Sequence, residues 1–187
     1  TTMAIWETSG LPANKVIGSG TSLDTARFRY ILSSKLHVNI EDVNAYILGE
    51  HGDSQVPIWS SANIGGFSLD EYALQVGVAL DREAIAQHTK NAGAEVIGLK
   101  GATFYGIAMA VSNIVEAIMK DDGALLPVSH VLDGSFGDWA GVAVSTVCRV
   151  GWGGIEQTLR ISMDEGERAS MDSSVKMLKE FWEQVKA

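Results

Sequence analysis

The most restrictive stretch of this chain is a run of four apolar residues, 45–48, that leads directly into G-E-H-G-D-S at residues 49–54. An apolar run that stops at glycines and acidic residues indicates a buried strand ending in a tight turn. Apolar residues resume after the turn, so the pattern predicts paired strands near 43–49 and 56–62. The turn between them would carry His51 toward a cleft rather than into the core.

His51 is the first candidate for chemistry in this turn. Histidine is the side chain whose ordinary pKa lies nearest neutrality, so a small change in its surroundings lets it give or take a proton. The plainer interpretation is that a histidine beside acidic residues is a solvated turn residue. Spacing alone does not choose between the two, and a second stretch of sequence is needed.

An upstream stretch begins with V-I-G-S-G-T and continues with apolar residues at helical spacing. It predicts a short strand at 15–18 and a helix at 21–35, with Asp24 and Arg27 on one face of that helix. One interpretation is purely local. Thr21 and Asp24 would form a capping box, and Asp24 with Arg27 an ion pair worth only about a few tenths of a kcal/mol.

Taken together with His51, the same helix supports a chemical interpretation. A carboxylate can orient an imidazole, an imidazole can protonate a carbonyl oxygen, and a guanidinium can hold a carboxylate through two parallel hydrogen bonds. Asp24, His51 and Arg27 therefore form a complete set of side chains for hydride transfer to a 2-oxo acid.

Three ordered motifs then resemble one known family: V-I-G-S-G-T-x-L-D-T-A-R-F-R-Y, A-Y-I-L-G-E-H-G-D-S-Q-V-P-I-W-S-S-A and K-G-A-T-F-Y-G-I-A-M-A. They resemble the carboxyl-terminal half of NAD-dependent L-lactate dehydrogenases, within the wider L-lactate/malate dehydrogenase family. The resemblance implies an α+β fold in which an antiparallel sheet packs with long helices. It also implies reversible hydride transfer between NADH and a small 2-oxo acid, pyruvate to L-lactate, in a homo-oligomer, either a tetramer or a dimer.

The resemblance also implies a role for individual residues. His51 would be the proton donor and acceptor, Asp24 its orienting carboxylate, and Arg27 the clamp on the substrate carboxylate. Three further residues would line the substrate or cofactor: Thr103 as a hydroxyl of the pocket wall, Ile107 as the apolar side chain packed on the nicotinamide ring, and Ser19 as a contact to the carboxamide.

The family's amino-terminal half carries a Rossmann domain, whose motifs this chain lacks. The nearest imitation starts at Gly18, but Leu23 stands where the third glycine belongs, and the acids at 41–42 precede the next apolar run instead of ending a strand. We therefore expect residues 1–187 to form one substrate-binding and catalytic domain, cut from a longer protein. NAD would be held mainly by the half that is absent.

Composition and charge narrow the class of protein further. With 187 residues, 46% of them hydrophobic and 20% charged, the chain can bury a core of its own. A net charge of −9 argues against nucleic acid and anionic membranes as partners, because both would repel it. Cys148 is the only cysteine and has apolar neighbours, so a buried thiol and a reducing, cytoplasmic location are expected. No apolar run reaches the roughly twenty residues of a membrane helix.

The remaining elements follow from periodicity and turn residues. Broken helices are expected between Asp81 and Lys120, interrupted by Gly98 and Gly101. Outside that region the expected elements are a helix at 1–9, strands at 124–132, 142–150 and 155–161 separated by glycine-rich turns, and a long final helix opened by Asp164. The Trp152-Gly153-Gly154 segment is typical of a hairpin turn rather than a phosphate loop.

Other chemistries have less support. The four histidines, at positions 37, 51, 88 and 130, are scattered without a metal-binding spacing, so no metal site is expected. The sequence around Ser54 lacks the second glycine of a nucleophile elbow, which disfavours a serine hydrolase. The serious rival is a non-catalytic module that keeps the family's subunit interfaces and serves assembly or regulation.

One departure from the family bears on the substrate. Where related lactate dehydrogenases commonly read N-A-A-Y-E-I-I, this chain has Gly93 and Ala94 in place of Ala and Tyr. Smaller wall residues predict a roomier pocket, in which a branched 2-oxo acid such as 2-oxoisocaproate becomes a substrate. The alternative is that these residues only ease helix packing. Malate dehydrogenase activity stays open, because the family's discriminating loop belongs to the absent half.

A second departure bears on regulation. Allosteric bacterial lactate dehydrogenases bind fructose 1,6-bisphosphate across a subunit interface with an arginine and a histidine. The arginine position matches Arg29, but the histidine position holds Asn44. With one of two cationic ligands missing, we expect little or no activation by the bisphosphate.

Overall fold

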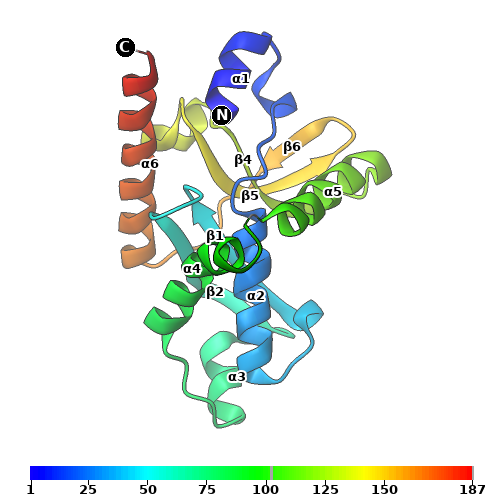
Figure 1. Cartoon of the computed structure of the whole chain (residues 1–187), viewed down its shortest axis with the longest axis vertical. Coiled ribbons are helices and arrows are strands. Elements are labelled where there is room, and N and C mark those ends of the chain that lie inside the picture. The colour runs from blue at the N-terminus through cyan, green and yellow to red at the C-terminus, as the bar shows by residue number, and fades with distance from the viewer. Residues whose placement is uncertain (102, 187) are drawn as a thin grey trace.

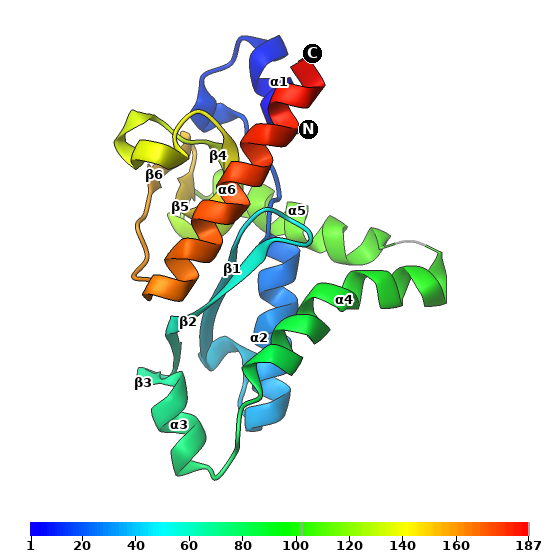
Figure 2. The same ribbon diagram turned by 90° about the vertical axis from the view of Figure 1, so that its left-hand side faces the viewer.

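A computed structural model describes residues 1–101 and 103–186. In this part of the chain, antiparallel strands form a sheet in the order β3-β2-β1-β5-β4, with β6 paired to β5. The strands are β1 (Val43–Gly49), β2 (Gln55–Ile64), β3 (Phe67–Ser68), β4 (Ala124–Val131), β5 (Ala143–Gly151) and β6 (Gly154–Thr158). The helices are α1 (Thr2–Ser9), α2 (Ser22–Leu36), α3 (Leu69–Gln75), α4 (Arg82–Lys100), α5 (Phe104–Lys120) and α6 (Glu165–Lys186). The antiparallel sheet with long helices confirms the expected α+β fold (Figures 1 and 2).

Gly49 is the point at which the two parts of the sheet meet. It pairs with Gln55 of β2 on one side and with Ser145 of β5 on the other. The Gly49–Ser145 pair is the one register pair between β1 and β5 among the described residues, so the strands diverge on either side of it. The turn that follows Gly49 therefore projects from the centre of the sheet.

Alternating side chains of β1 bury opposite faces of the sheet. Ile47 is fully buried with Phe28 and Leu32 of α2 in one apolar cluster. Leu48 is buried with Met171 of α6 in another. Helices α2 and α6 thus cover opposite faces of β1, as Figure 2 shows. Each helix brings one end or one face close to the residue where β1 ends.

Most of the expected elements are confirmed, with shifts of a few residues at their ends. The hairpin at Trp152 is confirmed by the pairing of Gly151 with Gly154. Cys148 is a free, buried thiol as expected, and burial raises its pKa. No helix in the described ranges is long and apolar enough to cross a membrane.

Two expectations about elements were wrong. The strand expected at 15–18 is instead the end of a 3-10 turn, Ala13–Lys15, followed by a single bridge from Gly18 to Ser129. Gly98 lies inside α4, and the helix ends at Gly101, whose φ of 80° is accessible mainly to glycine. The last expected strand is confirmed as β6, which ends at Thr158, three residues earlier than expected. Strand β3 and helix α3 were not anticipated.

Candidate active site

The first turn of α2 is fastened to the sheet by hydroxyl groups. The Thr21 hydroxyl donates to the carbonyl oxygen of Ile47 at 2.5 Å, and the Thr21 N–H donates to Ser145 Oγ at 3.0 Å. The Thr25 hydroxyl accepts from the Ile47 N–H at 2.9 Å. These bonds fix the start of the helix against the ends of β1 and β5, close to the turn that carries His51.

The capping box considered for this helix start does not form. Thr21 occupies the N-cap position, but its side chain makes no capping bond. Asp24, one turn further, is 2% exposed and directs its carboxylate toward His51. The ion pair of Asp24 with Arg27 does form, so the Asp24 carboxylate interacts both with another residue of α2 and with His51.

Asp24 joins the two other predicted residues through separate oxygens. Its Oδ2 lies 2.5 Å from Nδ1 of His51, and its Oδ1 lies 3.3 Å from a guanidinium nitrogen of Arg27. The side chain of Asp24 is 3% exposed and that of Arg27 is 17% exposed, while that of His51 is 60% exposed. The fold therefore buries the orienting acid and leaves the imidazole open to a ligand.

The pKa of His51 is raised above its ordinary value of 6.5. The largest cause is the hydrogen bond to Asp24, which favours the charged imidazolium, and the charges of Asp24 and Glu50 act in the same direction. Partial burial and the positive charge of Arg27 oppose the rise. The imidazole is therefore held in a state that can keep a proton near neutral pH and give it up to an acceptor.

The turn itself explains why His51 faces outward. Gly49 has a φ of 87°, a left-handed conformation that lets β1 end abruptly. The carboxylate of Glu50 then accepts from the N–H and the hydroxyl of Ser54, at 3.2 and 3.1 Å, and closes the turn. His51 and Ser19 both line a hollow of about 760 Å³ that this turn borders.

Arg27 and Thr103 lie in a neighbouring, smaller hollow of about 180 Å³. A side-chain carbon built on Gly93 of α4 would lie 3.4 Å from the Arg27 guanidinium, so the expected small residue directly faces the expected clamp. Helix α5 starts beside α2, because Gly106 approaches the Leu23 side chain closely. The structure thus brings Asp24, Arg27 and His51 together, with Thr103 beside Arg27.

Ile107 and the two regulatory candidates are placed less directly. Ile107 lies on α5, is 37% exposed, and lines neither of these two hollows. Arg29 donates to the carbonyl oxygen of Ala45 at 2.9 Å and stacks over the Tyr46 ring at 5.0 Å. The amide of Asn44 bonds to that of Asn63. Both regulatory candidates are therefore occupied with contacts inside the domain.

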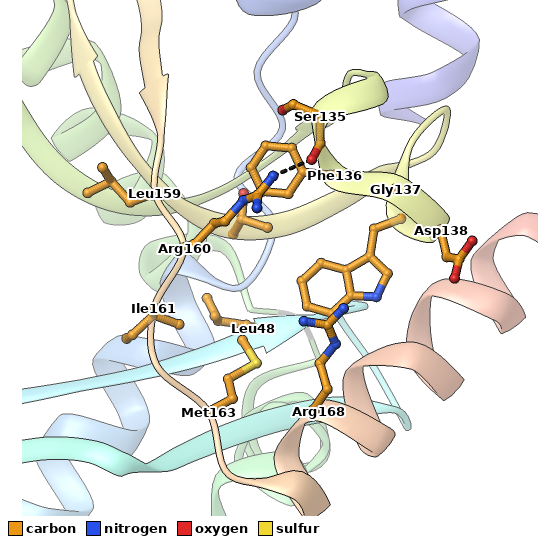
Figure 3. A pocket seen from close by; sticks show the side chains of 12 residues that line it. Leu48, Ser135, Phe136, Gly137, Asp138, Leu159, Arg160, Ile161, Met163 and Arg168 are labelled. Carbon is orange, nitrogen blue, oxygen red and sulfur yellow. Dashed lines mark hydrogen bonds between the residues drawn. The ribbon is translucent and has the colours of Figure 1, made fainter.

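A third hollow, of about 410 Å³, lies apart from these residues (Figure 3). Leu48 lines it, whereas the next residue, Gly49, lines the hollow of His51, so the two hollows meet opposite sides of β1. The guanidinium of Arg160 stacks over Phe136 and that of Arg168 over Trp139. None of the predicted site residues lines this hollow.

Two serines at the site were missed by sequence reasoning. Ser145 accepts from Thr21, and Ser174 of α6 accepts from the N–H of Glu50 at 2.9 Å. A serine on a strand or in an amphipathic helix has no spacing that marks it as part of a site, so the sequence offered no signal for either. Within the described residues, no group of three or more histidine, cysteine or acidic side chains is placed to hold a metal ion.

Comparison with known proteins places this arrangement in a family. The sequence pattern of the lactate/malate dehydrogenase alpha/beta C-terminal domain matches residues 21–187. An L-lactate dehydrogenase from Streptococcus mutans is 45% identical over 180 residues, which cover 95% of this chain and 55% of that protein. An L-lactate dehydrogenase from Acetivibrio thermocellus is 44% identical over 182 residues, covering 96% of this chain and 57% of that protein.

Solved structures agree with the sequence comparison. The ligand-bound minor L-lactate dehydrogenase from Enterococcus mundtii superposes with a TM-score of 0.92 at 39% identity, covering 98% of this chain and 59% of that one. A lactate dehydrogenase from a Medee basin deep-sea metagenome library gives a TM-score of 0.95 at 34% identity, covering 100% of this chain and 60% of that one. The chain spans a little over half the length of these relatives. It belongs to the lactate/malate dehydrogenase family and matches that family's alpha/beta C-terminal domain.

Proposed function

We propose that this chain is the substrate-binding and catalytic half of an NAD-dependent L-2-hydroxyacid dehydrogenase that interconverts pyruvate and L-lactate. The observation that carries the proposal is the buried carboxylate of Asp24, which contacts His51 and Arg27 through different oxygens. A histidine with a fixed ring and a raised pKa, beside a guanidinium in a hollow, suits a substrate that has both a carbonyl and a carboxylate.

The proposed roles follow from which atoms are already engaged. Nδ1 of His51 is held by Asp24, which leaves Nε2 to exchange a proton with the carbonyl oxygen of the substrate. Asp24 stabilises the imidazolium that forms when a hydroxyacid gives its proton to His51. Arg27 has donors beyond the one that meets Asp24, and these can grip the substrate carboxylate in a two-point geometry. Thr103 would then bound the pocket beside that grip.

The residues expected to meet NAD fit only its nicotinamide end. Ser19 brings a polar group to the hollow that His51 lines, and Ile107 offers a partly exposed apolar surface on α5. Bound NADH supplies the hydride. The phosphates and adenosine need further contacts, and we propose that an amino-terminal Rossmann half provides them, as the greater length of the relatives suggests.

We further propose that the pocket accepts branched 2-oxo acids. Gly93 faces the Arg27 guanidinium at a distance where a methyl group would just touch it, so its absence leaves space next to the clamp. Each extra methylene accommodated changes discrimination by about 1–3 kcal/mol. Little activation by fructose 1,6-bisphosphate stays a prediction, supported by the engagement of Arg29 and Asn44 within the domain.

The test is a substrate survey with the full-length protein. NADH oxidation would be followed with pyruvate, 2-oxoisocaproate and oxaloacetate, and kcat/KM compared. Turnover of pyruvate, together with measurable turnover of 2-oxoisocaproate, is the expected result. A marked preference for oxaloacetate would identify a malate dehydrogenase instead. No turnover of any of the three would favour the non-catalytic module.

A further inference from the structure

A single serine of the last helix contacts both ends of the turn that carries His51. Ser174 Oγ accepts the backbone N–H of Glu50 at 2.9 Å, and Glu50 is the residue directly before His51. The same oxygen lies 3.1 Å from the hydroxyl of Ser54, three residues after His51. Ser174 is separated from these residues by 120 or more positions, so this contact is tertiary rather than local.

The serine that makes this contact is buried, and its helix packs closely against the end of β1. Ser174 is 0% exposed. A side-chain carbon added to Gly49 would lie 2.8 Å from Ser174 Oγ, so the helix and the end of β1 are already in closest approach. Removal of the buried Ser174 hydroxyl leaves the N–H of the half-buried Glu50 without this partner, which weakens the attachment of the turn to α6.

A second residue of α6, near the start of the helix, also anchors this helix to the sheet. Glu167, in the first turn of α6, is buried and accepts from the backbone N–H groups of Trp59 and Ser60 of β2, at 2.6 and 2.9 Å. Glu167 and Ser174 are seven residues apart and thus lie on the same helix face. The first anchor sets the position of the helix along β2, and this places the second against the turn.

We propose that Ser174 is a positioning residue for the acid–base chemistry, and that it holds the backbone of the His51 turn at the distance where the imidazole meets Asp24. This inference rests on the proposed function, because it assigns Ser174 a role through His51. Among the described residues, Ser174 bonds to Glu50 and Ser54 and not to His51 itself. Ser174 would act on the position of His51 through Glu50 and Ser54, which are hydrogen-bonded to each other and close the turn.

The position of the imidazole can be read from its titration. The charged groups that act on His51 are Asp24 and Arg27 from α2 and Glu50 from the turn itself. The bond to Asp24 is the largest of these influences, and its length depends on where the turn stands. Displacement of the turn should therefore weaken that bond and move the titration midpoint of His51 down toward 6.5.

The experiment compares Ser174→Ala, Asp24→Asn and Ser173→Ala in the 187-residue chain. The midpoint of His51 is measured by proton NMR, with its signal assigned from its loss in His51→Gln. Ser173 is the matched control, since it neighbours Ser174 on α6 and is exposed, and within the described residues its hydroxyl bonds only to the Ala169 carbonyl oxygen. We expect a lower midpoint in Asp24→Asn, a smaller fall in Ser174→Ala, and no change in Ser173→Ala.

The outcomes separate this inference from the proposed function. If Asp24→Asn leaves the midpoint unchanged, the acid–base pair itself is wrong. If Asp24→Asn lowers the midpoint of His51 but Ser174→Ala does not, Ser174 has no positioning role. The same conclusion follows if Ser173→Ala lowers the midpoint as much as Ser174→Ala does. Should Ser174→Ala fail to fold, Ser174→Cys keeps a weak acceptor at similar volume, and its midpoint should lie between those of the native chain and Asp24→Asn. A native midpoint in that variant would overturn the proposal.

A kinetic measurement in the full-length protein provides an independent readout. A misplaced imidazole slows proton transfer but leaves the Arg27 grip intact. We therefore expect Ser174→Ala to lower kcat by roughly tenfold to hundredfold with little change in KM. A rise in KM with kcat preserved would contradict a role through His51.

Discussion

Asp24 divides its two carboxylate oxygens between His51 and Arg27, and this division decides how the imidazole titrates. The folded pKa of His51 is raised, so its contribution to stability is fully present below about 6.5 and is lost as pH rises through the raised value. The side chain is 60% exposed, which screens this contribution. The raised pKa of His51 therefore matters more for proton transfer than for the stability of the fold.

The direction of the pKa shift predicts the pH dependence of the reaction. In the proposed reaction, protonated His51 is the donor in reduction of a 2-oxo acid, so the rate of reduction should fall as pH rises through the raised pKa. In Asp24→Asn the imidazolium loses its charge partner, so that loss should begin at lower pH and kcat should fall by about tenfold or more. Rate profiles of the full-length protein between pH 5 and 9 test this. An unchanged rate and profile would leave Asp24 as a helix-stabilising residue only.

Arg27 offers the sharpest test of substrate binding. Lysine in its place keeps the charge but loses the planar two-point grip, which removes a hydrogen bond to a charged group worth roughly 1.5–3 kcal/mol. Arg27→Lys should therefore raise the KM for pyruvate by about tenfold to hundredfold. Arg82→Lys on α4, where the arginine pairs with Asp70 at the surface, is the control and should leave KM unchanged. Near-normal kinetics in Arg27→Lys would remove Arg27 from the site.

At the scale of elements, α4 combines two glycines in different surroundings. Gly93 faces the guanidinium of Arg27, whereas no atom of the described residues lies within 4 Å of a side-chain carbon built on Gly98. Alanine favours helix over glycine by about 1 kcal/mol in a helix interior. The two positions thus separate a helix effect from a pocket effect within one helix.

Gly93→Ala and Gly98→Ala should each raise the free energy of unfolding by up to about 1 kcal/mol, measured by urea denaturation. Only Gly93→Ala should also lower kcat/KM for 2-oxoisocaproate relative to pyruvate in the full-length protein, because only its methyl group narrows the space beside Arg27. An equal change of substrate preference in both variants would mean that these residues matter for helix packing alone.

The elements also show what the sequence could and could not predict. The hairpin around His51 was predictable because an apolar run, glycines and acids act locally. The strand expected at 15–18 was wrong because a pair of apolar residues does not determine strand pairing. Among the described residues, this segment forms a single bridge, from Gly18 to Ser129. The break between α4 and α5 was predictable because Gly101 has a left-handed conformation that favours glycine. A break at Gly98 was wrong, because Gly98 has a helical conformation that any residue can adopt.

Within the candidate site, helical spacing alone predicted only the pair formed by Asp24 and Arg27. Asp24 and Arg27 lie three residues apart on one helix, so their shared face follows from helical spacing. Their meeting with His51 depended on the family resemblance, since nothing in the spacing brings residue 51 to residue 24. Neither helical spacing nor the family resemblance pointed to Ser174, because a buried serine in an amphipathic helix resembles any other small core residue.

In the whole molecule, the end of α4 and the start of α5 extend away from the sheet (Figure 2). Leu99, Phe104 and Tyr105, at and beside the junction of these helices, are 86%, 72% and 81% exposed. Exposed apolar residues gathered in this way are typical of a surface that another domain or subunit covers. The relatives, which are longer, offer a candidate for that cover in their remaining half.

The isolated 187-residue chain should therefore associate, despite its net charge of −9. If this chain contacts only the nicotinamide end of NADH, as proposed, it should also bind NADH negligibly and turn over no pyruvate. Light scattering measures the first property and NADH fluorescence titration the second. A monodisperse monomer would refute the association argument, and micromolar NADH binding would show that the cofactor site lies within this chain.

The role of His51 as proton donor is tested by the turnover number for pyruvate reduction in full-length His51→Gln, compared with that in full-length His88→Gln. His88 is an exposed histidine of α4, so its replacement controls for loss of an imidazole without loss of the site. Removal of the general acid should lower kcat by about 100- to 10,000-fold in His51→Gln, and His88→Gln should keep native turnover. Native turnover in His51→Gln would contradict the assignment of His51 as the proton donor, and with it the proposed function of this domain.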